Sequence, residues 1–162
     1  VLSALVPYKR IDLAVEAFNA SGRPLLIAGK GPEEKRLRKM AGANIQFLGH
    51  VDRNGIQELY SQARGLIFPG VEDFGIVPVE APAAGCPVLA IGKGGALETV
   101  VSGKTGLFFD DATPQSLMEC VEKREKIQFK AADFARNASR FTEQAFELGM
   151  QKAINAQKRN RS

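Results

Sequence analysis

The chain of 162 residues has no tryptophan, two tyrosines, two cysteines and a single histidine. Its mild net charge of +4 comes mainly from basic residues near the C-terminus, and no aromatic residue alternates with them. The pattern that stacks the bases of single-stranded nucleic acid is therefore missing, and we expect no nucleic-acid partner. A weak attraction to an anionic membrane surface stays open beside the simpler interpretation, the solvated face of a terminal helix. The residues concerned are Lys152, Lys158, Arg159 and Arg161.

Cysteine and histidine are too few for a metal or redox centre. Cys86 and Cys120 match no metal-binding or redox spacing, and His50 alone cannot form a metal site. We expect two free thiols in a reducing, cytoplasmic compartment, and no bound metal. No apolar run approaches the roughly 20 residues that cross a bilayer. Residues 1–5 carry neither an initiator methionine nor a basic leader, which indicates a segment taken from a longer protein at a domain boundary.

What the chain does have is a regular alternation of apolar runs and helical patterns. The runs recur at intervals of roughly twenty residues, which is typical of β-α-β units. We predict a single domain, residues 1–162, with a three-layer Rossmann-like α/β fold and a parallel sheet of about six strands. The runs are residues 1–5, 24–28, 45–48, 65–68, 88–91 and 106–109.

The stretch from Glu72 to Gly85 organises the functional interpretation. A buried strand leads into it, a glycine turn is expected at Gly75, and a helix is expected to begin near Val77 or Pro78. The glycine lets the backbone approach a ligand closely. The free N–H groups and the positive end of the helix dipole then favour an anion.

Two carboxylates accompany this anion site, Glu72 in the loop and Glu80 in the first helical turn. An ionised carboxylate accepts hydrogen bonds from hydroxyl groups, so the pair suits a ligand that carries hydroxyls as well as phosphates. A nucleotide sugar has both. The alternative is that Glu80 only complements its helix dipole and Glu72 is a solvated loop charge.

Other loops are expected at the same edge, because ligands bind outside the carboxyl ends of strands in open parallel sheets. The loops after the first, third, fourth and fifth runs would open toward that crevice. A flexible glycine loop, residues 92–95, precedes a short helix near Ala96. The glycine turn at residues 29–32 lacks the third glycine of the dinucleotide fingerprint, since Glu34 stands there, and we interpret it as a plain turn. Asn54 is the expected N-cap of the helix that follows the third run.

Four motifs in order resemble the C-terminal, nucleotide-binding half of a GT-B glycosyltransferase. They are most similar to the retaining family 4 enzymes, which include sucrose synthases and many mannosyltransferases. The Glu72-x7-Glu80 motif is specific by itself, and the four together span residues 1 to about 109. They are Leu5-Val6-Pro7-Tyr8-Lys9-Arg10-Ile11-Asp12, Phe47-Leu48-Gly49-His50-Val51, Glu72-x7-Glu80 with Phe74-Gly75 inside and Ala84-Gly85-Cys86-Pro87-Val88 after it, and Gly94-Gly95 with Glu98, Gly103 and Gly106.

The resemblance implies a role for each motif. Lys9 would contact the donor diphosphate, Glu72 would be the catalytic carboxylate that holds the donor sugar's hydroxyls, and Glu80 would bind the ribose. The other donor-binding positions would be Arg10, Val51 beside the nucleobase, Phe74, Gly75, Ile76 and Val77. One departure stands out: Ala4 occupies a place where the family has an arginine, and Arg10 is the residue that could replace its charge.

The function implied is retaining transfer of a hexose from a nucleotide sugar, without a catalytic metal or other cofactor. Because the Pro-Tyr-Lys-Arg opening looks most like mannosyltransferases of polysaccharide biosynthesis, GDP-mannose is the first donor to consider and a UDP-sugar the second. The acceptor, a saccharide or a lipid-linked one, would bind an absent N-terminal domain. We therefore expect this chain alone to be inactive, and the parent enzyme to be cytoplasmic or at the inner face of the membrane.

Two other classes of protein stay open. A non-hydrolysing UDP-sugar epimerase shares the GT-B architecture, although Glu72 and Glu80 beside Phe74-Gly75 argue against it. A non-catalytic nucleotide-binding or scaffold module would have kept the fold and lost turnover, and Ala4 is the feature that favours it.

Overall fold

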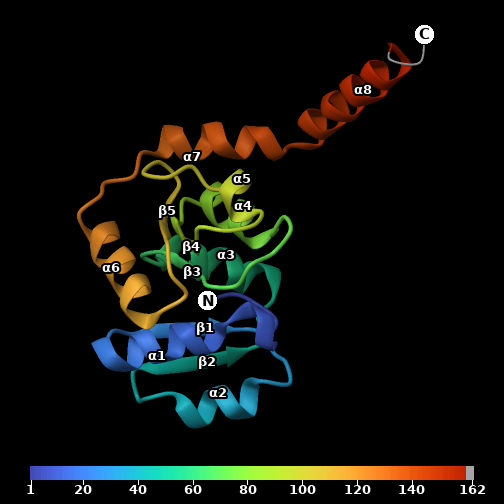
Figure 1. Cartoon of the computed structure of the whole chain (residues 1–162). Coiled ribbons are helices and arrows are strands. Elements are labelled where there is room, and N and C mark those ends of the chain that lie inside the picture. Colours follow the sequence, from blue (N-terminus) through green and yellow to red (C-terminus); the bar gives the residue numbers. More distant parts are fainter. Residues whose placement is uncertain (160–162) are drawn as a thin grey trace.

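The computed structural model describes residues 1–159, and in them all the strands pair in parallel (Figure 1). They form two sheets, one of β1 and β2 and one in the order β3-β4-β5. The predicted α/β class and parallel pairing are confirmed, with five strands in place of about six. The strands are β1 (Leu25–Ala28), β2 (Ile45–Gly49), β3 (Leu66–Phe68), β4 (Val88–Ile91) and β5 (Gly106–Phe109).

Helices cover both faces of these strands. The α-helices are α1 (Ile11–Ser21), α2 (Glu34–Met40), α3 (Arg53–Gln62), α4 (Val77–Ala83), α5 (Ala96–Thr99), α6 (Pro114–Glu125), α7 (Ala131–Ala138) and α8 (Glu143–Arg159). Two short 3-10 helices, η1 (Pro7–Lys9) and η2 (Ser139–Phe141), join them. The expected helix starts at Val77, Ala96 and Pro114 are confirmed.

The core consists of two clusters on opposite faces, as the two-residue repeat of a strand requires. In β4, Leu89 and Ile91 pack in the cluster that contains α1 and α6, whereas Val88 and Ala90 pack with residues of α3, α4 and α5. All four side chains are buried. This burial on both faces explains why the strands read as unbroken apolar runs.

Residues 1–5 do not form the predicted first strand. Leu2 makes a single parallel bridge with Ala28, and the Leu5 N–H donates to the Lys30 carbonyl. A tight turn follows at once, in which the Val6 N–H donates to the Ala4 carbonyl at 3.1 Å. The segment therefore runs along β1 for too short a distance to make a regular ladder, which leaves the strands in two sheets.

Helix caps explain several of the element boundaries. Gly85, with φ +82°, follows α4, and the Cys86 N–H donates to the Ala81 carbonyl in a Schellman arrangement. The prediction that Asn54 caps α3 is wrong, because the Asp52 carboxylate takes that place and accepts from the Gly55 N–H at 2.8 Å. Asp52 precedes the helix directly, where an N-cap must lie, and Asn54 is already inside it.

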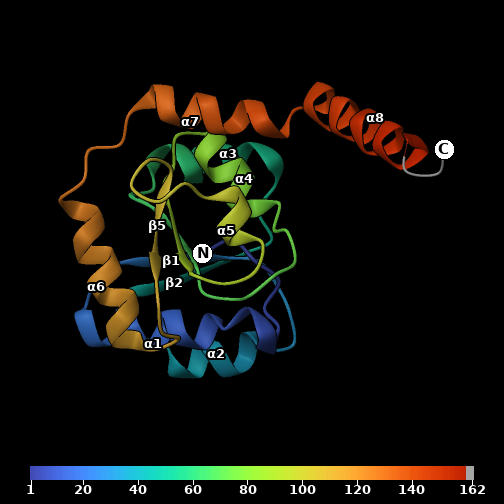
Figure 2. The same cartoon turned by 45° about the horizontal axis from the view of Figure 1, so that its top comes forward.

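The C-terminal region differs from the body of the domain. Helix α7 lies against α4, whereas α8 extends away from the rest of the molecule (Figures 1 and 2). Lys152 is exposed on α8; Arg161, and the side chains of Lys158 and Arg159, lie outside the described part. Among the residues that the structure describes, no helix has the length and apolarity needed to span a membrane.

Candidate functional site

The loop between β3 and α4 contains the expected glycine turn. Gly75 is buried and has φ +79°, a conformation that other residues rarely adopt. A Cβ at Gly75 would lie 3.2 Å from Pro78 Cδ and 3.3 Å from the Phe68 ring. Both the backbone angle and the space therefore require glycine, and α4 begins two residues later at Val77.

The glycine pair Gly94–Gly95, in the loop after the neighbouring strand β4, packs against this loop. The Gly95 N–H donates to the Glu72 carbonyl at 2.7 Å. A Cβ at Gly94 would lie 2.5 Å from the same carbonyl oxygen, and a Cβ at Gly95 would lie 2.5 Å from Phe74 Cα. The loop after β4, which we expected to be flexible, therefore packs backbone against backbone under the loop that carries Glu72.

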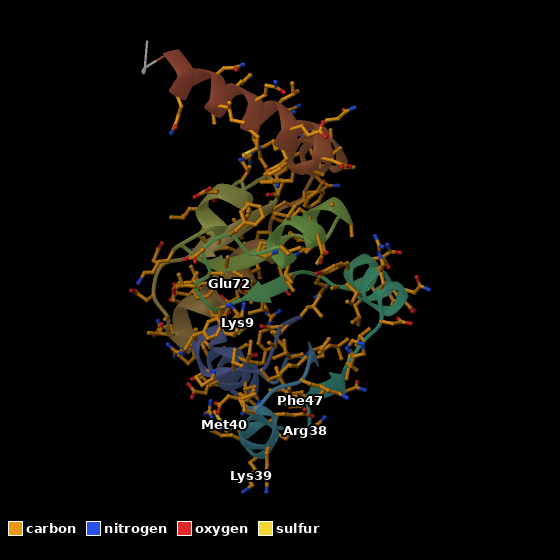
Figure 3. All side chains as sticks on the ribbon, turned by 90° about the vertical axis from the view of Figure 1, so that its right-hand side faces the viewer. Lys9, Arg38, Lys39, Met40, Phe47 and Glu72 are labelled. Atoms are coloured by element: carbon orange, nitrogen blue, oxygen red, sulfur yellow. The ribbon has the colours of Figure 1, made fainter. Side chains whose placement is uncertain are left out.

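Lys9 reaches the same loop from η1. A Cβ at Gly70 would lie 2.7 Å from Lys9 Cα, so this glycine lets the two segments touch. The Lys9 ammonium forms an ion pair with the Glu72 carboxylate, and Figure 3 shows the two side chains side by side in the middle of the molecule. The structure thus brings together the two residues to which the family resemblance assigned the diphosphate and the sugar.

The ion pair is mostly shielded from water, since the side chains are only 14% and 23% exposed. A shielded pair contributes little net stability, because desolvation offsets the attraction, but it fixes both groups in place. The result is a cation that can bind phosphate beside an acceptor-only carboxylate that can bind hydroxyls.

Arg10 is placed differently. Its backbone is left-handed, with φ 52°, and its Nε lies 3.3 Å from Asp12 Oδ1. It therefore pairs with a carboxylate on its own helix. Ala4, which stands in the place of the family's arginine, is exposed.

The remaining predicted positions line the start of α4. Glu80 is exposed in the first turn, and the side chains of Phe74 and Ile76 are 46% and 68% exposed. The Phe74 ring meets Phe141 edge to face, with the centroids 6.0 Å apart. Pro78 has no N–H, so this helix end offers fewer donors to an anion than a full first turn would.

Val51 and Lys30 follow neighbouring strands of the smaller sheet. Val51, half-buried, comes after β2. Lys30 comes after β1, and its Cε lies 3.7 Å from where a Cβ at Gly49 would stand. We had interpreted the turn that contains Lys30 as a plain turn. Because Lys30 follows a parallel strand, the rule that ligands bind outside the carboxyl ends of such strands would have placed its ammonium at the candidate site.

The two thiols lie outside this site and are buried. Both cysteines are free and buried, and burial raises the pKa of each thiol to about 11. At neutral pH they remain protonated, and a protonated thiol is a poor nucleophile. Burial, with the charge of nearby Glu80, also raises the pKa of Tyr60.

With this geometry established, comparison with known proteins defines the class. Residues 1–141 match the family described as glycosyl transferases group 1, so the chain belongs to this family. It is 36% identical over 138 residues to a GDP-mannose-dependent alpha-(1-6)-phosphatidylinositol monomannoside mannosyltransferase of Mycobacterium tuberculosis. It is also 36% identical over 143 residues to the alpha-1,3/1,6-mannosyltransferase ALG2 of Mus musculus.

These matches cover 74% and 82% of this chain, but only 36% and 34% of the two relatives. The chain therefore spans about a third of their length.

Solved structures confirm the GT-B architecture. Sucrose-phosphate synthase from Thermosynechococcus elongatus superposes with a TM-score of 0.80 and 24% identity, over 99% of this chain and 45% of that one. Alr3699/HepE from Anabaena, in complex with UDP, superposes with a TM-score of 0.79 and 24% identity, over 96% and 47%. At such identities the likeness establishes the fold alone.

Proposed function

We propose that this domain binds the nucleotide-sugar donor of a retaining hexosyltransferase, with GDP-mannose as the donor. The observation that carries the proposal is the Lys9–Glu72 ion pair at the carboxyl edge of the strands. Membership of the group 1 glycosyltransferases supports it.

The chemistry of the proposed site follows from three side chains. The Lys9 ammonium would neutralise the diphosphate as it leaves, in place of a metal ion. The Glu72 carboxylate would accept hydrogen bonds from sugar hydroxyls, and Glu80 would do the same for the ribose. Lys9 would exchange its contact with Glu72 for a phosphate oxygen, which frees Glu72 for the sugar.

The choice of mannose and guanine rests on the relatives. The Mycobacterium tuberculosis relative is described as GDP-mannose-dependent, and the Mus musculus relative is a mannosyltransferase. The structures of Alr3699/HepE contain UDP or UDP-glucose. UDP-sugars are therefore the second donor class, and binding to the bases must be compared directly.

For the parent protein we propose the complete reaction. The bond from the anomeric carbon to the diphosphate breaks, and a bond to an acceptor oxygen forms with the same configuration. The acceptor, a saccharide or lipid-linked saccharide, would be held by an additional N-terminal domain. This chain would then bind the donor but transfer nothing by itself.

The test is calorimetric titration with GDP, UDP, ADP and GDP-mannose. GDP and GDP-mannose are expected to bind best, and Glu80→Ala is expected to weaken them roughly tenfold, because it removes a charged partner of the ribose hydroxyls. Glu122→Ala is the matched control, since Glu122 is an exposed carboxylate on α6. Equal losses in the two variants would contradict the assigned role of Glu80.

A scaffold module is the second candidate, and the uncharged Ala4 favours it. It predicts that no nucleotide binds, even when the parent protein supplies the acceptor domain. Titrating the full-length protein separates this outcome from a donor site that needs domain closure.

A further inference from the structure

The short helix α5 is capped by side chains from a later part of the chain, where α7 lies next to it (Figure 1). It has four residues, and a helix this short is not stable by its own hydrogen bonds. The last carbonyls of a helix also lack partners within it. The Asn137 side chain of α7 donates to the Thr99 carbonyl at 2.9 Å. The Arg140 guanidinium of η2 donates to the Glu98 carbonyl, also at 2.9 Å.

The two capping side chains are bonded to each other. The Nη1 atom of Arg140 donates to the Asn137 side-chain oxygen at 2.8 Å. Asn137 is buried, and both ends of its amide are hydrogen-bonded, as a buried amide requires. The pair therefore fixes the position of α5 relative to α7.

The other end of α5 contacts the loop that contains Glu72. The buried Thr99 hydroxyl donates to the Gly95 carbonyl at 3.0 Å. The Gly95 N–H in turn donates to the Glu72 carbonyl at 2.7 Å. A continuous series of contacts therefore leads from Arg140 through α5 to the main chain of Glu72.

Phe141 reaches the same loop directly. Its ring meets the Phe74 ring edge to face, with the centroids 6.0 Å apart. The Arg140 guanidinium lies 5.0 Å from the centre of the Phe141 ring. Both arrangements are favourable for an aromatic ring. The loop is thus held at two points, at Glu72 through α5 and at Phe74 through Phe141.

We propose that Arg140 and Phe141 are positioning residues, which hold the loop of residues 72–76 in the conformation that binds the donor sugar. Neither would touch the donor. They would act through Glu72 and Phe74, whose main chain they fix in advance, so that the ligand does not have to order the loop when it binds. The inference rests on the proposed function, because it takes the sugar hydroxyls as the partners of Glu72.

The first experiment measures hydrogen exchange and needs no ligand. In Phe141→Ala, exchange at the Gly95 amide is expected to become about tenfold faster, because its bond to Glu72 opens more often. Exchange at the hydrogen-bonded, buried Val88 amide of β4 reports on the whole fold and should not change. Phe146→Ala is the matched control, since Phe146 is 68% exposed on α8.

A second variant tests the cap on α5. Arg140→Met removes the donor to the Glu98 carbonyl and should speed exchange at Gly95 by about threefold. Arg136→Met is its control, because Arg136 is an exposed arginine of α7. Phe141→Tyr keeps the aromatic ring and is expected to behave as the unchanged chain does.

The second experiment tests whether donor binding depends on this contact. In calorimetric titrations, Phe141→Ala should weaken GDP-mannose binding about tenfold and GDP binding less than about twofold, since only GDP-mannose carries the sugar assigned to Glu72. A role in stability alone would weaken both ligands equally. Phe141→Tyr should restore the ratio of the two affinities.

Equal exchange rates at Gly95 in Phe141→Ala and Phe146→Ala would overturn the proposal, and so would equal losses for the two ligands. If neither ligand bound the unchanged chain or the full-length protein, the proposed function would be wrong. Exchange at Gly95 would still show whether Arg140 and Phe141 hold the loop, so the two failures are distinguishable.

Discussion

The carboxyl ends of the strands are closely packed, whereas the amino ends of β1 and β3 are not. At the carboxyl edge, three loops press backbone against backbone at Gly70, Gly94 and Gly95, and an ion pair closes the contact. Near the amino ends of β1 and β3, mostly apolar residues of both sheets line a hollow of about 420 Å³. The comparison teaches that close loop packing brings charged groups together for a ligand, whereas the mostly apolar residues around the hollow leave space between the two sheets.

The largest effect is expected from a single methyl group at the tight edge. In Gly95→Ala, the new Cβ would lie 2.5 Å from Phe74 Cα and from the Asp73 carbonyl oxygen. Because both are backbone atoms, the loop can make room only by moving its main chain, which costs free energy. We expect the free energy of unfolding to fall by about 2 kcal/mol, and nucleotide binding to be lost with the displaced Glu72 loop. Chemical denaturation and calorimetry measure the two effects.

The control for that substitution is Gly149→Ala in α8. No atom lies within 4 Å of the Cβ it adds, so it should leave binding unchanged and stabilise the helix by roughly 0.5–1 kcal/mol. If Gly95→Ala were equally harmless, the two loops would not be as closely packed as described.

The next effect compares the ion pair at the carboxyl ends of the strands with an ion pair beside the hollow. Lys9→Met removes the cation beside Glu72, and we expect nucleoside diphosphates to bind roughly 10- to 100-fold more weakly. Arg23→Met removes the cation of the Arg23–Glu125 pair, whose atoms lie 2.5 Å apart beside the hollow, and it should leave binding unchanged. Similar binding by the two variants would remove the distinction between the edges.

The last effect is a pH dependence of stability that originates at the Val1 ammonium beside the hollow, and it leaves nucleotide binding unchanged. The pKa of the Val1 ammonium is lowered from 8.0 to about 6, so the unfolded chain binds more protons between these values. Stability should therefore rise from pH 6 to pH 8, by at most roughly 2–3 kcal/mol. Denaturation curves at the two pH values measure it. An N-terminal Gly-Ser-Gly-Ser extension, which turns the Val1 amine into an amide and moves the terminal amine away from this place, should abolish this part of the change.

Local signals were enough to predict much of this structure. The glycine turn at Gly75 and the helix start at Pro114 depend on residues next to them in the chain. The buried strands followed from apolar runs, because both of their faces are covered. Residues 1–5 look like such a strand, but they make only one isolated bridge with β1 before the chain turns at Ala4–Val6. The composition of residues 1–5 does not reveal how few bonds they make with β1.

The site was predictable in its parts and not in its contacts. The parallel-sheet rule brought Lys9 and Glu72 to one edge, but their ion pair depends on Gly70 letting two distant segments touch. The same holds for Gly94 and Gly95, whose closeness to Glu72 and Phe74 is a contact between separate loops.

The buried, protonated thiols have a practical consequence. Because burial keeps the pKa values of Cys86 and Cys120 near 11, maleimide reagents should modify both slowly at neutral pH. A cysteine introduced at Ile76, which is 68% exposed beside Glu72 and Glu80, would then be the preferred point of attachment. A dye placed there, with the two native cysteines left unchanged, would report by fluorescence whether a nucleotide binds at the proposed donor site.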